Sequence, residues 1–508
     1  MRADYRHSRR TFLQAVGVGV AGTVVLPRWL TAAEGAPLAR PNVIIILTDD
    51  QGYGDIACLN NPKIKTPNLD RMHAESIRFT DFHVSSTCSP TRCSLMTGRH
   101  EFKSGVTHTI MERERMSLKA TTIAQVLKSA GYTTGIFGKW HLGDEPDRWP
   151  DKRGFDEMFI HGDGGIGPTY AGSCGDAPGN SYFSPTVLHN GKFEKTDGYC
   201  TDVFFGQATK WLDEKRKAGT PFLAYITPNA PHAPLNCPEE YEKKYEGMGL
   251  TPQEMKFFGM ITNIDDNVGR LLAKLTEWGI DRSTLVIFMN DNGGTAGLKV
   301  FNAGMRGGKG TPYNGGTRAA SFWRWPGTLK AGADVDNLAC HRDIFPTLAE
   351  LAGAKVPDDV AAKLDGRSLA PLLADPAAAW PDRYFFTHIG RWAKGKAAES
   401  KYAGCSVRNQ RYNMVSSKGG GGDANWELYE LKSDPGETKN IAAEHPDVIK
   451  EMSAAYDKWW AEVLPCLENE DVVGPAVNPF KELYWKQFGG SPTDAGAAPK
   501  QGRKNKKQ

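Results

Sequence analysis

The sequence predicts an α/β fold: a large mixed β-sheet flanked by helices on both faces, followed by a smaller C-terminal antiparallel sheet with a helix. Three observations carry this prediction. Continuous apolar runs of strand length recur along the chain, as expected for strands buried on both faces. Segments with apolar residues at helical spacing separate these runs. Short strand patterns and one long helical pattern then follow near the C-terminus.

Strand and helix patterns alternate through the larger part of the chain. The strands of the large sheet are predicted at 42–47, 132–137, 222–226 and 284–289. Helices are predicted from about Cys88, at 122–127, at 202–217 and at 261–275. Gly131 and Gly279 lie where two of these helices should end. Residues 159–200 are rich in Gly, Ser, Asp and Asn, so this stretch is predicted to be mostly loop.

The C-terminal part is predicted to form a separate, smaller domain. Its strands are expected around 383–387, 412–416 and 427–431, and its helix at about 446–463. The predicted domain boundaries are therefore 40–378 for the large domain and 379–488 for the smaller one. Residues 489–508 are rich in Gly, Ala, Pro and Lys, and they are predicted to be a disordered basic tail.

The N-terminus is typical of a twin-arginine export signal. The run SRRTFL at 8–13 precedes an apolar stretch at 15–26, and Ala33 offers a small residue for cleavage. A membrane anchor is the alternative, but spanning a bilayer takes about 20 apolar residues and this stretch is shorter. We therefore expect residues 1–33 to engage the twin-arginine export machinery, so that the protein becomes periplasmic or secreted. Retention as a membrane-tethered precursor is the other outcome.

Composition excludes some function classes. The chain has 508 residues, 40% hydrophobic and 24% charged, with a net charge of +3. No concentrated basic face is found within the folded part, so no nucleic-acid partner is expected. The nine cysteines include no Cys-x-x-Cys pair, which argues against a zinc or redox motif. Export would permit disulfides, but their connectivity is left open.

Oxygen-bearing side chains follow two of the predicted strands. Asp49 and Asp50 come directly after the strand at 42–47, and Asp291 and Asn292 follow the strand at 284–289. Ligands of α/β sheets bind beyond the carboxyl ends of strands, and adjacent carboxylates are costly unless a cation neutralises them. An all-oxygen set favours one Ca²⁺ ion, with Mg²⁺ as the alternative. A solvated turn or a helix N-cap would also explain a single Asp.

The segment CSPTRCSLMTGR at 88–99 is the most distinctive motif. Pro90 suits the first turn of a helix, so Cys88 would lie where backbone N–H groups favour an anion. The segment resembles the signature Cys-x-Pro-x-Arg, then Leu-x-Thr-Gly-Arg, of the type I sulfatases. That resemblance implies the alkaline-phosphatase-like sulfatase fold and a formylglycine, made from Cys88 by a maturation enzyme, whose hydrate is the nucleophile. The alternative is a buried thiol that packs as a small hydrophobe.

Further segments resemble the same family, and together they cover nearly the whole mature chain. They are GKWHLG at 138–143, PHAP at 231–234, RGGKG at 306–310, the stretch at 341–369, and LYEL at 428–431. The resemblance implies that Cys88 joins the metal shell with the four residues named above. It also implies six catalytic residues, which are Cys88, Arg92, Lys139, His141, His232 and Lys309.

The resemblance assigns roles within this set. Arg92, Lys139 and Lys309 would screen and stabilise the charge of the sulfate, with Arg92 also orienting the hydrate. His141 would act as the base on the hydrate. His232, with Lys309, would serve the leaving alcohol oxygen.

The sequence therefore predicts an exported sulfuric ester hydrolase. Export and the polar insertion at 161–200 favour a sulfated carbohydrate as substrate, with aryl sulfates as adventitious ones. His388, Arg391 and Trp392 are weaker candidates for the rim of the pocket, since an aromatic ring can stack on a sugar and Arg can hold an anion. Two alternatives stay open: a phosphate or phosphonate monoester hydrolase, and, without conversion of Cys88, a sulfated-glycan binding protein.

Overall fold

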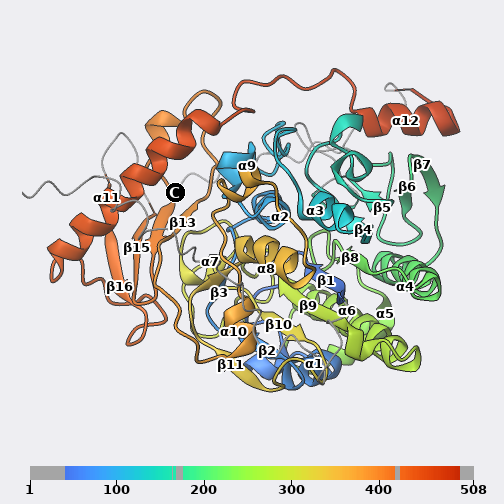
Figure 1. The fold of residues 1–508 in the computed structure, drawn as a ribbon, viewed down its shortest axis with the longest axis horizontal. Coiled ribbons are helices and arrows are strands. Elements are labelled where there is room, and N and C mark those ends of the chain that lie inside the picture. The colour runs from blue at the N-terminus through green and yellow to red at the C-terminus, as the bar shows by residue number, and fades with distance from the viewer. Residues whose placement is uncertain (1–39, 163, 167–175, 418–423, 492–508) are drawn as a thin grey trace, which may run out of the picture. The chain divides into compact units, whose positions relative to one another are not determined.

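A ten-stranded mixed sheet forms the centre of the molecule (Figure 1), in a computed structural model that describes residues 40–162, 164–166, 176–417 and 424–491. The strand order is β11-β2-β10-β9-β1-β8-β4-β5-β6-β7. The strands are β1 Asn42–Thr48, β2 Ile77–Phe79, β4 Thr133–Lys139, β5 Glu157–His161, β6 Thr186–His189, β7 Lys192–Lys195, β8 Phe222–Thr227, β9 Thr284–Asn290, β10 Ser321–Arg324 and β11 Ala333–Val335. Two short strands, β3 Phe82–His83 and β12 Ala339–Cys340, pair separately.

The central strands are parallel. β1 pairs in parallel with β8 and β9, and β4 pairs in parallel with β8 and β5. The carboxyl ends of these five strands therefore meet at one edge of the sheet, where ligands of α/β sheets bind. β10, β6 and β7 pair antiparallel with their neighbours, which makes the sheet mixed, as predicted.

Helices cover both faces of this sheet. Ile44 and Ile46 of β1 belong to a core cluster with residues of α1, α4 and α6, whereas Val43 and Ile45 point to the opposite face and are also fully buried. On that second face α3 packs against β4 and α8, and α2 packs against α3 and α8. The helices named here are α1 Pro67–Ala74, α2 Cys88–Thr97, α3 Ile123–Ser129, α4 Cys200–Ala218, α6 Pro252–Glu277 and α8 Ile344–Leu351. The shorter ones are α5 Glu239–Glu242, α7 Asn314–Thr317, α9 Asp358–Ala361 and α10 Ala370–Ala374.

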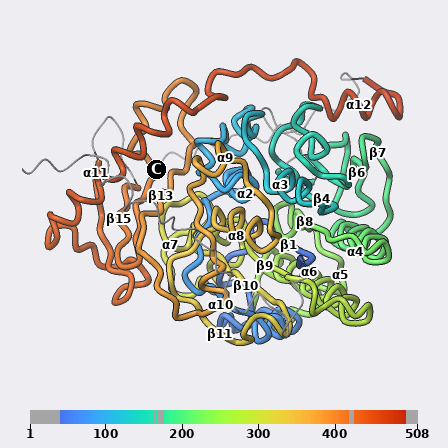
Figure 2. Tube along the Cα trace, in the orientation of Figure 1, coloured from blue at the N-terminus to red at the C-terminus, as the bar shows by residue number. Residues whose placement is uncertain are grey.

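The predicted small antiparallel sheet with its helix is also present, at one end of the molecule (Figure 2). Its strands are β13 Phe385–His388, β14 Cys405–Arg408, β15 Tyr412–Ser416 and β16 Glu427–Glu430, and α11 spans Pro446–Val463. Trp459 of α11 stacks on Phe386 of β13, with ring centroids 5.1 Å apart. Phe102, from the large domain, belongs to the same core cluster, so the two parts pack closely. The last helix, α12 Pro479–Phe488, packs against β7.

Some elements differ from the sequence prediction. The stretch predicted as mostly loop contains the end of β5 and all of β6 and β7, and β14 was not predicted at all. β7 has a single buried residue, Phe193, so it shows none of the apolar run that marks a central strand. The predicted signal peptide and nearly all of the predicted tail lie outside the described residues.

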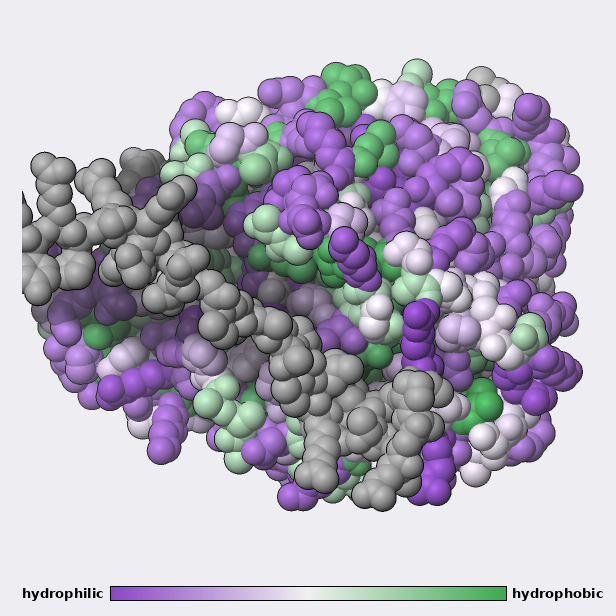
Figure 3. Space-filling model, in the orientation of Figure 1, coloured by the Kyte–Doolittle hydropathy of each residue, from purple (hydrophilic) through white to green (hydrophobic). Residues whose placement is uncertain are grey.

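Two surface and covalent features complete the fold. Hydrophilic residues dominate the face seen in Figure 3, with hydrophobic ones scattered among them. Within the described part of the chain, every helix is too short or too polar to cross a membrane. The eight cysteines in that part are all free.

Candidate active site

The carboxyl edge of the central strands brings the predicted residues together. Asp49 and Asp50 directly follow β1, and Asp291 and Asn292 directly follow β9. Lys139 is the last residue of β4, next to β8 in the sheet. Since β9, β1, β8 and β4 are consecutive neighbours, residues far apart in sequence lie within reach of one another.

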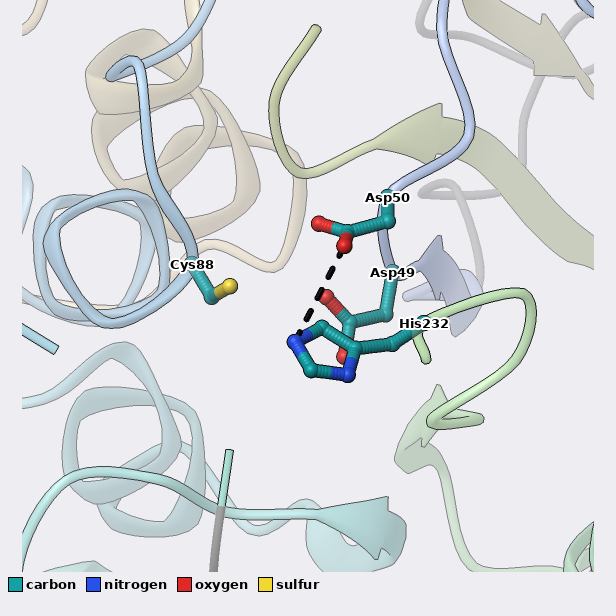
Figure 4. A group of neighbouring side chains, drawn as sticks. All are labelled: Asp49, Asp50, Cys88 and His232. Atoms are coloured by element: carbon teal, nitrogen blue, oxygen red, sulfur yellow. Dashed lines mark ion pairs between the residues drawn. The ribbon is translucent and has the colours of Figure 1, made fainter. Parts of the chain in front are cut away.

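Four ligand-type side chains converge at this edge (Figure 4). The ligand atoms of Asp49, Asp50, Cys88 and His232 all lie within 4.8 Å of one another. His232 was predicted to be catalytic and not a metal ligand, so its place in this cluster is an addition. Asp291 is not one of the four, but its Oδ1 accepts the backbone N–H of Asp50 at 3.1 Å.

The arrangement fits a hard cation. Asp49 Oδ1 and Asn292 Oδ1 are buried without a hydrogen-bond partner among the described residues, which is costly for an oxygen unless a cation or donor faces it. Burial and the neighbouring charge of Asp49 raise the pKa of Asp291 to about 7, as happens when carboxylates crowd together. These oxygen donors match the ligand preference of Ca²⁺.

Three cations pair with the three carboxylates. Lys139 Nζ lies 2.6 Å from Asp49 Oδ2, and Lys309 Nζ lies 2.5 Å from Asp50 Oδ1. The third pair joins Arg92 Nη2 to Asp291 Oδ2 at 3.0 Å.

These pairs keep the site charged. Burial opposes the charge on Lys139, but the combined attraction of Asp49, Cys88 and Asp291 exceeds this effect and raises the pKa of Lys139, so Lys139 stays protonated at neutral pH. Burial likewise opposes the charge on Lys309, but the combined attraction of Asp50 and the other acidic groups of the site exceeds this effect and raises the pKa of Lys309. The site therefore presents fixed positive charge beside its carboxylates, as anion binding requires.

Cys88 is the first residue of α2, and Pro90 lies in the first turn, as predicted. The side chain faces the carboxylates (Figure 4) and the residue is only 2% exposed. Burial raises the pKa of the Cys88 thiol to about 12, although Lys139 and Lys309 oppose this shift. A thiol with that pKa is protonated at neutral pH, and the protonated form is a poor nucleophile.

His141 is held as a neutral base. Its Nε2 donates to the carbonyl oxygen of Thr109 at 2.8 Å, so Nδ1 carries the lone pair, and no described residue pairs with this buried Nδ1. Burial and the charge of Lys139 hold the pKa of His141 well below its usual value. The residue has a left-handed backbone, with φ 58°, which is uncommon outside glycine and recurs at functional sites.

His232 contributes a second imidazole to the site, close to Asp50. Its Nδ1 donates to the carbonyl oxygen of Ala233 at 2.6 Å, which directs Nε2 towards Asp50, 3.8 Å from Oδ2. Burial lowers the pKa of His232, and the nearby Asp50 counteracts part of this shift. Its Nε2 can therefore exchange a proton near the carboxylate cluster.

Two glycines give both imidazoles their space. A Cβ on Gly164 would lie 3.1 Å from Cε1 of His141, and a Cβ on Gly165 would lie 2.9 Å from Nδ1 of His232. The carbonyl oxygen of Gly164 also accepts from Lys139 Nζ at 2.6 Å. Sequence reasoning treated this glycine pair only as a loop signal, and it missed Thr109 because a backbone carbonyl leaves no side-chain pattern.

Two of the predicted rim residues do not line the site. His388 is 4% exposed and stacks on Trp460, and Trp392 is 7% exposed with the guanidinium of Arg113 over its ring. The prediction for His388 and Trp392 was wrong, because the aromatic residues of the smaller domain form its own core. Arg391, between them, remains exposed. In the predicted polar insertion, 163 and 167–175 lie outside the described residues.

Comparisons with known proteins agree on one family. A family model described as Sulfatase matches residues 41–354, and a model of the C-terminal part of N-sulphoglucosamine sulphohydrolase matches residues 309–459. N-acetylgalactosamine-6-sulfatase from Rattus norvegicus is 32% identical over a match covering 67% of this chain and 67% of that protein. Arylsulfatase A from Homo sapiens is 29% identical and covers 83% of this chain and 88% of that protein. The crystal structure of Ps i-CgsB in complex with k-i-k-neocarrahexaose is 26% identical, with a TM-score of 0.73, covering 90% of this chain and 99% of that chain.

Proposed function

The chain belongs to the sulfatase family and is a sulfuric ester hydrolase, and from this premise we propose that it uses a formylglycine made from Cys88 and one Ca²⁺ ion to desulfate carbohydrates outside the cytoplasm. The resemblance seen in the segment at 88–99 and the alkaline-phosphatase-like sulfatase fold are both confirmed. The nucleophile, the metal, the substrate and the cellular location form the proposal.

The environment of Cys88 carries the proposal for the nucleophile. Its thiol lies at the focus of carboxylates, cations and imidazoles, yet its raised pKa makes it a poor nucleophile in the unmodified form. A formylglycine at this position would add water to form a hydrate, and a hydroxyl oxygen of that hydrate would be the attacking atom. A purely structural thiol would also be buried in this way, but a structural role for Cys88 does not explain why charged side chains surround it.

The metal proposal rests on the donor set. Asp49, Asp50, Asp291 and Asn292 would hold Ca²⁺ together with the modified Cys88, and the ion would supply charge that stabilises sulfate oxygens. Mg²⁺ is the alternative ion, because it also prefers oxygen ligands, although it demands a more regular octahedral shell.

The remaining residues bind charge and move protons. Lys139, Lys309 and Arg92 hold positive charge beside Cys88, where an anionic ester group must lie to be attacked. The lone pair on Nδ1 of His141 suits it to remove a proton from the nucleophile. His232, when its Nε2 is protonated, can donate to the leaving alcohol oxygen.

The relatives support a carbohydrate substrate. One relative is named for desulfating N-acetylgalactosamine at position 6, and the similar solved structure contains a neocarrahexaose. The twin-arginine pattern at 8–13 adds the proposed location, because an exported enzyme meets extracellular polymers. The proposed partners are therefore a sulfated carbohydrate, a formylglycine-generating enzyme and the twin-arginine export machinery.

Mass spectrometry of the peptide that contains Cys88, combined with assays of released sulfate, tests this proposal. We expect the mass of the aldehyde form in the active protein, sulfate release from at least one sulfated oligosaccharide, and complete loss of turnover in Cys88→Ala with an unchanged melting temperature. Activity that survives Cys88→Ala would contradict the nucleophile assignment. A preference for phosphate or phosphonate monoesters, or glycan binding by a protein that keeps its thiol, would favour one of the two alternatives.

A further inference from the structure

Arg391 is an exposed cation at the edge of the active site. Its Nη1 lies 3.9 Å from the place that a Cβ on Gly310 would occupy, and Gly310 directly follows Lys309. The N–H of Gly310 donates to the carbonyl oxygen of Ser86 at 2.8 Å, two residues before Cys88. The guanidinium of Arg391 therefore lies beside the paired backbone segments that carry Lys309 and Cys88. Among the described residues, none forms a hydrogen bond or ion pair with it.

The backbone that carries Arg391 is fixed in place. Gly390 has φ +68°, and a Cβ there would lie 1.8 Å from the carbonyl oxygen of Thr107, so only glycine fits this close approach. Arg113 donates to the carbonyl oxygens of Gly390 at 2.5 Å and Trp392 at 2.9 Å. The turn of the smaller domain is thus fastened to the segment at 107–113 of the large domain.

That segment also reaches the catalytic centre. Thr109 accepts the hydrogen bond from His141, and the residue before it is His108. Nδ1 of His108 accepts the N–H of Thr109 at 2.8 Å and of Ile110 at 3.2 Å, so the proton of the neutral ring lies on Nε2. Burial, followed by the charges of Arg113 and Arg391, lowers the pKa of His108 to about 4. His108 is therefore a neutral N–H donor near Arg391.

We propose that Arg391 and His108 form an anion subsite at the rim of the active site, which binds a second anionic group of the substrate. This rests on the proposed function, and it narrows the substrate to carbohydrates that carry either a further sulfate or a uronic acid carboxylate near the scissile sulfate. A guanidinium matches the geometry of both groups and can bind either with two parallel hydrogen bonds.

The charge balance supports a substrate as the occupant. The three carboxylates of the catalytic centre already pair with three cations, so Arg391 adds a positive charge that no described carboxylate neutralises. An arginine held by a fixed turn from another domain, and left without a partner among the described residues, is placed to receive an anion from solution.

Binding to the Cys88→Ala protein tests the subsite without requiring turnover. The probes are monosulfated disaccharides and their counterparts that carry a second sulfate or a uronate, with calorimetry as the readout. We expect the second anion to improve affinity by roughly tenfold, as a charged hydrogen bond does, and added Arg391→Gln to remove this gain. Comparing the two kinds of counterpart identifies which anion is preferred. Equal affinity for the probes with one and two anions, or a gain that survives Arg391→Gln, would overturn the subsite.

Kinetics of the active enzyme give the second readout. For a substrate with two anions, Arg391→Gln should raise KM by roughly tenfold with little change in kcat, and kcat/KM for 4-nitrophenyl sulfate should be unchanged. His108→Asn keeps an acceptor for the N–H of Thr109 but removes the Nε2 donor. We therefore expect it to raise KM for the substrate with two anions by less than Arg391→Gln does. Arg411→Gln is the matched control, because it removes the same charge at the opposite end of the small sheet, where Arg411 pairs with Glu430. An equal effect of Arg391→Gln on 4-nitrophenyl sulfate would overturn the assignment, whereas no sulfate release from any ester would contradict the proposed function instead.

Discussion

Gly164 leaves no spare room beside the imidazole of His141. A methyl group there would lie 3.1 Å from Cε1 of His141, closer than an ordinary contact, so we expect Gly164→Ala to displace the ring from its present position. A displacement of about 1 Å in a catalytic group can cost on the order of a hundredfold in rate. We therefore expect kcat to fall by roughly tenfold to a hundredfold, with little change in melting temperature, as measured by sulfate release and thermal unfolding.

Gly206, inside α4, provides the matched control for this substitution. A Cβ on Gly206 would meet nothing within 4 Å, and replacing glycine by alanine inside a helix stabilises it by about 0.5–1 kcal/mol. Gly206→Ala should therefore leave kcat unchanged. A Gly164→Ala enzyme with full activity would show that the ring of His141 need not stay where it lies.

Asp291 connects the cation pairs to the proposed metal site. Its Oδ2 pairs with Arg92 and its Oδ1 accepts the N–H of Asp50, so Asp291→Ala removes a charge, a ligand and a bridge. We expect the bound calcium, measured by elemental analysis, to fall well below one equivalent, and activity to be lost with it. The exposed Asp334, paired with Arg78, is the control position. Calcium content equal to that of the unaltered protein would remove Asp291 from the site.

At the scale of elements, a buried carboxyl group joins α7 of the large domain to the smaller sheet. Glu437 is fully buried, and its oxygens accept the N–H of Asn314 in α7 and Nδ2 of Asn413 in β15. Burial raises the pKa of Glu437 to about 7 from 4.5. Between these two values the folded protein binds a proton that the unfolded chain has released. This contribution to stability is therefore present below about pH 4.5 and is lost as the pH rises to 7.

We expect Glu437→Gln to flatten the pH dependence of folding. A shift of this size corresponds to about 3 kcal/mol in the free energy of unfolding, while Gln keeps an acceptor for Asn314 and does not titrate. Urea unfolding at pH 5 and pH 8 should show a smaller loss of stability for the variant than for the unaltered protein. Identical pH profiles would mean that Glu437 is ionised in the folded state throughout this range.

The elements predicted from sequence are those whose local pattern matches their final burial. β1, β8 and β9 are buried on both faces, so each reads as a continuous apolar run, and α11 begins at the predicted Pro446 and ends at Val463. β7 and β14 lacked such a signal, because their position depends on neighbouring strands and not on their own four residues. Tertiary context decides short strands of this kind.

The candidate site divides in the same way. Side chains that carry charge or lone pairs, such as Asp49, Lys139 and His232, could be predicted because they lie at or beyond the carboxyl ends of strands at one edge of the sheet. The carbonyl of Thr109 and the space left by Gly165 could not, since a backbone contact depends on the path of a loop. His388 and Trp392 were misjudged because the sequence does not distinguish an aromatic residue on a rim from one in a small core.

At the scale of the whole molecule, a bound dication should stabilise the fold. Ca²⁺ would bind the folded protein and not the unfolded chain, which adds about 2.7 kcal/mol of stability at a concentration one hundred times the dissociation constant. We expect treatment with a chelator to abolish sulfate release and lower the melting temperature. Added Ca²⁺ should restore both, and Mg²⁺ should restore less, as assayed by calorimetry and activity after dialysis. A melting temperature that changes neither with chelator nor with added Ca²⁺ would contradict the metal proposal.

The burial of Cys88 limits the time during protein synthesis in which this residue could be modified. All ten residues of α2 are buried in the folded protein, so the proposed maturation enzyme would have to bind this segment before it folds. The 420 residues that follow Cys88 take roughly 20 to 80 s to synthesise at usual rates, and α11 and α12 emerge last. If the formylglycine proposal holds, chains that fold around an unmodified thiol would remain inactive. The specific activity of a preparation would then depend on whether modification of Cys88 or folding around it is faster. Slower translation downstream of Cys88 should therefore raise the specific activity.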